Sequence, residues 1–87
     1  MFNVIWDAVD PQLIDYWTAA GSAKRRAITN AVNRLDKRLR QRPQDGIPAI
    51  DPDFLTMTEH PIRVFYDIDS AQQKVVIRAL TILNPSP

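Results

Sequence analysis

Residues 61–69 read PIRVFYDID, and residues 74–83 read KVVIRALTIL. Both stretches are rich in β-branched and aromatic residues, and a short polar loop separates them, which is the pattern of a β-hairpin. Apolar and polar residues alternate in the first stretch, and this alternation predicts that Tyr66 faces the core. Arg63 interrupts the apolar pattern of that strand, which makes it a candidate functional residue.

Upstream of the hairpin, the sequence predicts two more strands and two helices. Residues 2–7 (FNVIWD) alternate as a short strand does, and residues 54–59 (FLTMTE) give a weaker strand signal. Between them, residues 11–20 and 23–42 carry apolar residues at helical spacing. The short turn between the two helices predicts an antiparallel helix hairpin.

Residues typical of helix ends mark both helices. We expect Asp10 to cap the first helix, with Pro11 at its first position, and Gly21 to end it in the left-handed conformation. Ser22 is the expected cap of the second helix, and Pro43 ends it because the residue before a proline avoids helical angles.

Each helix has one apolar face that predicts its contact with the core. On the first helix the face consists of Leu13, Ile14, Trp17 and Ala20; on the second it consists of Ile28, Ala31, Val32, Leu35 and Leu39. We expect Trp6 and Trp17 to be core residues.

The order strand, helix, helix, strand, strand, strand predicts an α+β fold. We expect a single domain over residues 1–87, with an antiparallel sheet, the helix hairpin packed on one of its faces and residues 84–87 frayed. The other face of the sheet is then partly open, and Arg63 is expected there.

Composition is that of a globular domain, with 45% hydrophobic and 24% charged residues. The chain has no cysteine and one histidine, His60, so disulfides and thiolate metal sites are excluded and no metal or other cofactor is expected. We expect His60 to be solvent-exposed. No apolar run approaches the roughly 18 residues that span a bilayer, and residues 1–10 do not resemble a secretory signal, so the expected location is cytoplasmic.

Positive charge is concentrated in the second helix. Residues 24–42 contain eight basic residues and one acidic residue, a net charge of +7, whereas the rest of the chain has a net charge of −6. The basic side chains expected to project away from the core are Arg26, Arg34, Lys37 and Arg40. This face is either a binding surface for nucleic-acid phosphates or a partner, or the solvated side of an amphipathic helix. Arg78 either meets an acidic partner or is an edge-strand charge that discourages aggregation.

Taken together, these elements resemble the RelE/ParE superfamily of bacterial toxins. The resemblance rests on the order of the elements, the basic second helix, and an arginine-led strand followed by a Val-rich strand, here Arg63-Val64-Phe65-Tyr66-Asp67-Ile68 and Val75-Val76-Ile77. It implies the toxin of a type II toxin–antitoxin pair, bound by a protein antitoxin. In this superfamily, RelE-like members cut messenger RNA on the ribosome, and ParE-like members inhibit DNA gyrase.

This sequence contains only some of the catalytic residues that a RelE-like ribonuclease would need. Arg63 matches the family's arginine and is the one candidate catalytic residue. Thr56 and Phe54 stand where lysines would be, and residues 83–87 (LNPSP) contain no arginine, histidine or tyrosine. Glu59 and His60 are adjacent and do not match the glutamate–histidine pair of other members.

Three functions therefore remain open. The favoured one is a toxin-like protein with little or no ribonuclease activity that acts by binding, as a ParE-like inhibitor or as a degenerate toxin that still engages an antitoxin. The second is a ribosome-dependent endoribonuclease that uses Arg63. The third is a small nucleic-acid-backbone binder working through the second helix. A functional role for Arg63 competes with an ion pair to Asp67, and the sequence leaves open whether the chain forms a homodimer.

Overall fold

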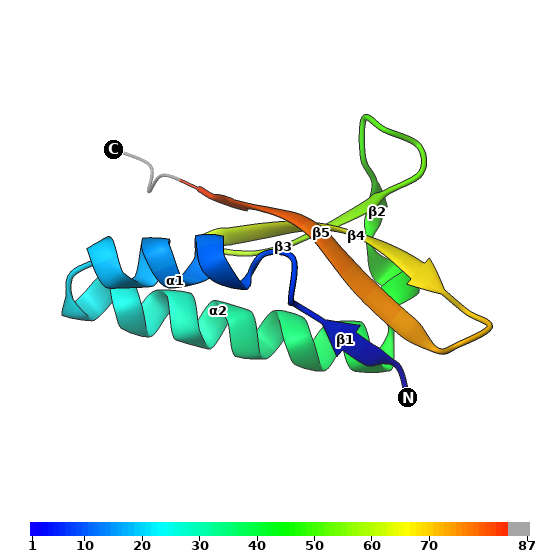
Figure 1. Cartoon of the computed structure of the whole chain (residues 1–87), viewed down its shortest axis with the longest axis horizontal. Coiled ribbons are helices and arrows are strands. Elements are labelled where there is room, and N and C mark those ends of the chain that lie inside the picture. The colour runs from blue at the N-terminus through cyan, green and yellow to red at the C-terminus, as the bar shows by residue number, and fades with distance from the viewer. Residues whose placement is uncertain (84–87) are drawn as a thin grey trace.

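The computed structural model describes residues 1–83, so the predicted fraying of residues 84–87 lies outside the described residues. These residues form two helices, a 3₁₀ turn and five strands (Figure 1). In chain order these are β1 (Asn3–Ile5), α1 (Asp10–Ala19), α2 (Ser22–Gln41), η1 (Pro43–Asp45), β2 (Ile47–Pro48), β3 (Leu55–Glu59), β4 (Ile62–Asp69) and β5 (Lys74–Ile82). None of the helices is long and apolar enough to cross a membrane within this part of the chain.

The strands form one sheet in the order β1-β5-β4-β3-β2. This confirms the predicted α+β fold, with two differences from the sequence-based expectation. The sheet is mixed, because β1 runs parallel to β5, whereas the other neighbouring strands are antiparallel. In addition, the proline-rich connector contributes β2, which pairs with only two residues of β3, Leu55 and Thr56.

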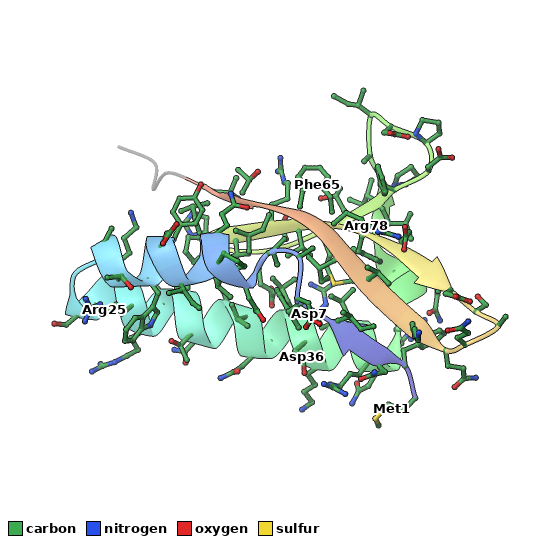
Figure 2. All side chains as sticks on the ribbon, viewed as in Figure 1. Met1, Asp7, Arg25, Asp36, Phe65 and Arg78 are labelled. Atoms are coloured by element: carbon green, nitrogen blue, oxygen red, sulfur yellow. The ribbon has the colours of Figure 1, made fainter. Side chains whose placement is uncertain are left out.

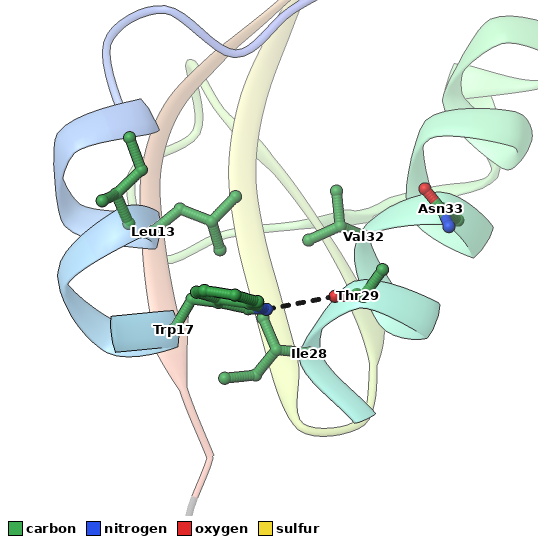
Figure 3. A pocket seen from close by; sticks show the side chains of 7 residues that line it. Leu13, Trp17, Ile28, Thr29, Val32 and Asn33 are labelled. Atoms are coloured by element: carbon green, nitrogen blue, oxygen red, sulfur yellow. Dashed lines mark hydrogen bonds between the residues drawn. The ribbon is translucent and has the colours of Figure 1, made fainter. Parts of the chain in front are cut away.

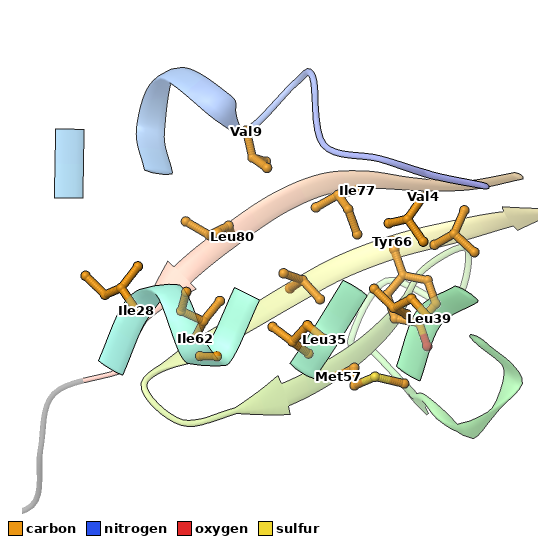
Figure 4. Packing of buried hydrophobic residues seen from close by; sticks show 13 residues of the cluster. Val4, Val9, Ile28, Leu35, Leu39, Met57, Ile62, Tyr66, Ile77 and Leu80 are labelled. Atoms are coloured by element: carbon orange, nitrogen blue, oxygen red, sulfur yellow. The ribbon is translucent and has the colours of Figure 1, made fainter. Parts of the chain in front are cut away.

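The core lies between the sheet and α2 (Figure 4). The predicted apolar face of α2 is confirmed, with four of its five residues buried and Val32 partly buried. The buried hydrophobic residues are Val4, Val9, Ile28, Ala31, Leu35, Leu39, Met57, Ile62, Val64, Tyr66, Val75, Ile77 and Leu80. Because the helices cover one face of the sheet, the opposite face is left without a covering layer (Figure 1).

Helix α1 packs less closely than its apolar face predicted, since none of its residues is buried. Leu13 is half-buried, Ile14 is 62% exposed and Trp17 is 42% exposed, so the prediction that Trp17 is a core residue is wrong. The other tryptophan, Trp6, is half-buried against the core, and its Nε1 donates a hydrogen bond to Asp36 of α2 at 3.0 Å.

The predicted helix caps are wrong. Asp10 is the first residue of α1, its cap position is taken by Val9, and no side chain caps the helix because the turn that begins at Trp6 already leads into it. Gly21 has a φ of −75° and not a left-handed conformation. It precedes α2 as an extended residue, and Ser22 is already helical.

Tyr66 anchors the connector after α2 to the sheet. Its side chain is fully buried, as predicted, and its hydroxyl donates a hydrogen bond of 2.5 Å to the carbonyl oxygen of Pro43. Burial raises the pKa of Tyr66 to about 12. Gly46 lies directly against the phenol ring, where an added Cβ would stand 2.0 Å from the hydroxyl oxygen. This contact fixes the position from which residues 47–54 project beyond the sheet (Figure 1).

Candidate binding surface on the open sheet face

Arg63 lies on the open face of the sheet, as predicted. In β4, buried Ile62, Val64 and Tyr66 alternate with side chains that point away from the helices. Those outward side chains include Arg63, which is exposed. They also include Phe65, which is half-buried (Figure 2). The strand therefore presents a cation beside an aromatic ring on the uncovered face.

The ion pair between Arg63 and Asp67, the alternative to a functional role for Arg63, is absent from the described residues. Asp67 accepts a hydrogen bond of 3.0 Å from Nε of Arg78, because the two residues meet across β4 and β5 next to a register shift at Phe65 and Tyr66. Arg63 instead donates its Nε to the Thr58 hydroxyl of the neighbouring strand β3 at 3.2 Å. Its guanidinium therefore lies across Thr58, toward the side of β3 that is remote from β4.

A groove of about 530 Å³ opens at this place. One wall is the projecting segment that follows η1, in which Ile47 is 69% exposed and Ile50 is fully exposed. The other walls come from β3, β4 and the end of α2. The lining residues are Arg38, Asp45, Ile47, Pro48, Ala49, Ile50, Thr56, Met57, Thr58, Arg63 and Phe65.

The ionisable residues that line this groove are two arginines and one aspartate. Asp45 is paired with Arg42 at 3.4 Å. Arg38 is 3.8 Å from Glu59, which also pairs with Arg34 at 3.4 Å. The groove is therefore a cationic site with an apolar wall, a combination suited to an anion that carries apolar groups.

The predicted basic face of α2 is partly neutralised within the protein. Arg34 is paired with Glu59, and Arg40 is paired with Asp36 at 2.7 Å. Arg26 and Lys37 are exposed and make no ion pair with other described residues. None of these four residues lines the groove that holds Arg63, so the structure does not bring them together with it.

Arg78 and His60 also lie outside the groove. Arg78 is in β5, which pairs with β4 along its length but with β1 only at Lys74, Val75 and Val76, so Arg78 itself lies beyond the end of β1. His60 is exposed, as expected, in the turn between β3 and β4, beside Lys24 at the start of α2. No group of three or more residues suited to hold a metal ion occurs in residues 1–83.

A second groove, which the sequence did not predict, lies between α1 and α2 (Figure 3). It has a volume of about 240 Å³ and is lined mainly by apolar side chains around Trp17, whose Nε1 donates to the Thr29 hydroxyl at 3.3 Å. The guanidinium of Arg25 stacks 4.5 Å above the Trp17 ring and donates to the carbonyl oxygens of Trp17 and Thr18. Arg25 thereby caps the carbonyl groups at the C-terminal end of α1, and no local sequence signal predicts this role.

Comparison with known proteins finds no family model that matches this chain, no similar curated protein and no similar solved structure.

Proposed function

We propose that this chain is a toxin-like protein of the RelE/ParE kind, the toxin of a bacterial type II toxin–antitoxin pair, and that it acts by binding. The proposal is supported by the arginine-led strand and by the order of the elements around it. The observation that carries it is the state of Arg63, an exposed guanidinium on the uncovered sheet face, hydrogen-bonded to a hydroxyl and directed into an open groove. An arginine so placed can bind a carboxylate or a phosphate with its remaining donors.

The chemistry of the groove favours binding over RNA cleavage. Cleavage at a 2′-hydroxyl requires a group that takes a proton and a group that returns one to the leaving oxygen. Arginine does neither, because it stays protonated in proteins. Of the remaining candidates, Asp45 is engaged in an ion pair, and Tyr66 is buried with its hydroxyl already donated to Pro43. The groove lining within the described residues includes no lysine, histidine or glutamate.

The partners that follow from this proposal are an acidic protein antitoxin and a cellular target, either the ribosome or DNA gyrase. Of the four cations predicted to project from α2, Arg26 and Lys37 are left to contact such a partner, because Arg34 and Arg40 are already paired. The cytoplasm is the compartment in which both targets are found.

Growth of a bacterial host after induced expression tests this proposal. We expect the native chain to arrest growth and Arg63→Ala, at equal protein level, to relieve the arrest. Arg63→Lys keeps the charge but removes the fork of donors. Lys24→Ala is the control, because Lys24 is an exposed cation that does not line the groove. Arrest by Arg63→Ala as strong as that by the native chain would refute the role of Arg63. Normal growth with the native chain would refute a toxin function.

A further inference from the structure

The edge of β3 is incompletely paired. Five residues form β3, but β2 pairs only with Leu55 and Thr56, because η1 ends just before β2 begins and does not extend the pairing. Alternate residues of a strand direct their backbone N–H and C=O groups to the same side. Since Pro48 has no N–H, the hydrogen-bonded pair is the other one, Ile47 with Thr56. Two residues further on, Thr58 directs its backbone groups to the same side, beyond the end of β2.

The groove described above occupies the space beside this free edge, because Thr56, Met57 and Thr58 all line it. From the outer face of the sheet, Arg63 reaches across Thr58 toward the edge. From the opposite face, Arg38 of α2 approaches the same edge through its contact with Glu59 at 3.8 Å. Two cations therefore flank one short piece of unpaired strand, one on each face of the sheet.

We propose that this edge binds an extended, acidic segment of a partner protein, which adds to the sheet next to Met57, Thr58 and Glu59. Strand addition to an exposed edge is a common mode of peptide recognition, in which the backbone supplies hydrogen bonds and alternate side chains supply specificity. This inference deepens the proposed function, on which its protein partner rests, by naming the contact and the chemistry of the segment.

The geometry specifies the segment. Consecutive side chains of a strand point to opposite faces of a sheet. The residue opposite Thr58 therefore faces Arg63, and its chain neighbour faces Arg38. Two adjacent acidic residues would pair with both arginines. Within residues 1–83 of the folded chain, Arg63 has only the Thr58 hydroxyl as a partner, and Arg38 has only a long ion pair with Glu59. Apolar residues on the side of the segment toward β2 are favoured by the exposed side chains of Ile47 and Ile50.

A peptide fits this site better than an RNA strand does. The backbone N–H and C=O groups of Thr58 are spaced to pair with another extended polypeptide, and the wall formed by Ile47 and Ile50 is aliphatic. Phe65 is half-buried, so it offers little of its face for base stacking.

Selection from a display library of random octapeptides on the immobilised protein tests this inference. We expect enrichment of peptides with two adjacent acidic residues flanked by apolar ones. Fluorescence polarisation with such a peptide should show binding about fivefold to tenfold weaker for Arg63→Ala and for Arg38→Ala. Binding to Lys24→Ala should be unchanged. In the complex, hydrogen exchange at the Thr58 amide should slow.

Four results would overturn the inference: no enriched octapeptide, enriched peptides without acidic residues, an unprotected Thr58 amide in the complex, or tighter arginine-dependent binding of a single-stranded RNA octamer. The last result would identify a nucleic-acid site. Because peptide binding and growth arrest are measured separately, loss of one does not imply loss of the other, and a failure of this inference is distinguishable from a failure of the toxin proposal.

Discussion

Replacement of Gly46 by alanine should destabilise the protein strongly, because the fold leaves no space for a methyl group at this position. An ideal Cβ on Gly46 would lie 2.0 Å from Oη and 2.9 Å from Cζ of Tyr66, and 3.1 Å from the carbonyl oxygen of Thr56. The backbone at Gly46 has a φ of −65°, which any residue adopts, so the objection to alanine is purely steric. The phenol ring cannot move aside freely, because it is fully buried and tied to Pro43.

The cost follows from two contributions. Overpacking a filled core costs about 1–3 kcal/mol, and displacing the Tyr66 hydroxyl from Pro43 sacrifices a hydrogen bond worth about 1 kcal/mol. We therefore expect Gly46→Ala to lower the free energy of unfolding by about 2–4 kcal/mol. A chain of this length has a total of roughly 4–13 kcal/mol, and the loss corresponds to a fall in Tm of very roughly 10–30 °C.

Urea unfolding followed by far-UV circular dichroism measures this loss. Gly21→Ala is the matched control, because an added Cβ at Gly21 meets nothing within 4 Å, and as a change at the N-cap of α2 it should cost about 1 kcal/mol or less. Tyr66→Phe removes the oxygen that the new methyl group would strike. Gly46→Ala should therefore cost at least about 1 kcal/mol less in the Tyr66→Phe background than in the native chain. A cost of Gly46→Ala below about 1 kcal/mol, or equal costs in both backgrounds, would refute the reasoning.

Three further predictions concern stability. Because the pKa of Tyr66 is raised from 10.0 to about 12 in the folded state, its contribution is complete below pH 10 and is lost as the pH rises toward 12. The native chain should then lose about 2–3 kcal/mol more than Tyr66→Phe over this range in urea unfolding, and equal losses would contradict the burial argument. Asp36→Ala removes the acceptor of Trp6 Nε1 and the partner of Arg40 and should cost about 1–2 kcal/mol, read from the urea midpoint. An unchanged midpoint would show that this bridge between Trp6 and α2 adds no stability. Gln73 has a φ of 52°, so Gln73→Gly should stabilise the β4–β5 turn by about 0.5–1 kcal/mol in thermal unfolding, and a lowered Tm would contradict this expectation.

The elements with strong hydrophobic periodicity were predictable from the sequence. The buried face of α2 and the hairpin of β4 and β5 follow from spacing alone, because each buries one regular set of side chains. The connector strand β2 was not predictable, because it has two residues and one is Pro48, a residue that argues against a strand except at an edge. The parallel pairing of β1 depends on contacts with β5, which lies far away in the chain.

Helical spacing of apolar residues also fails to predict the exposure of a side chain when that exposure depends on which element packs against the helix face. Trp17 shares a helical face with Leu13, but the sequence does not say whether that face is covered, and the structure leaves it half open.

The candidate site was predictable only in part. Alternation in β4 placed Arg63 on the open face, as the structure has it. Its hydrogen-bond partner Thr58 required the register between β3 and β4, and the pairing of Arg78 with Asp67 required the register between β4 and β5. The approach of Arg38 to the same groove required the packing of α2 on the sheet. Long-range register and packing are the parts that a single sequence leaves open.

The central claim, that the chain acts through Arg63 by binding and not by cutting RNA, is tested most directly by mapping messenger RNA 5′ ends in host cells after induction. The comparison is between the native chain and Arg63→Ala at equal protein level. We predict growth arrest by the native chain without new RNA ends relative to the variant. New ends within translated messages that appear with the native chain and disappear with Arg63→Ala would contradict this account and identify the chain as an endoribonuclease.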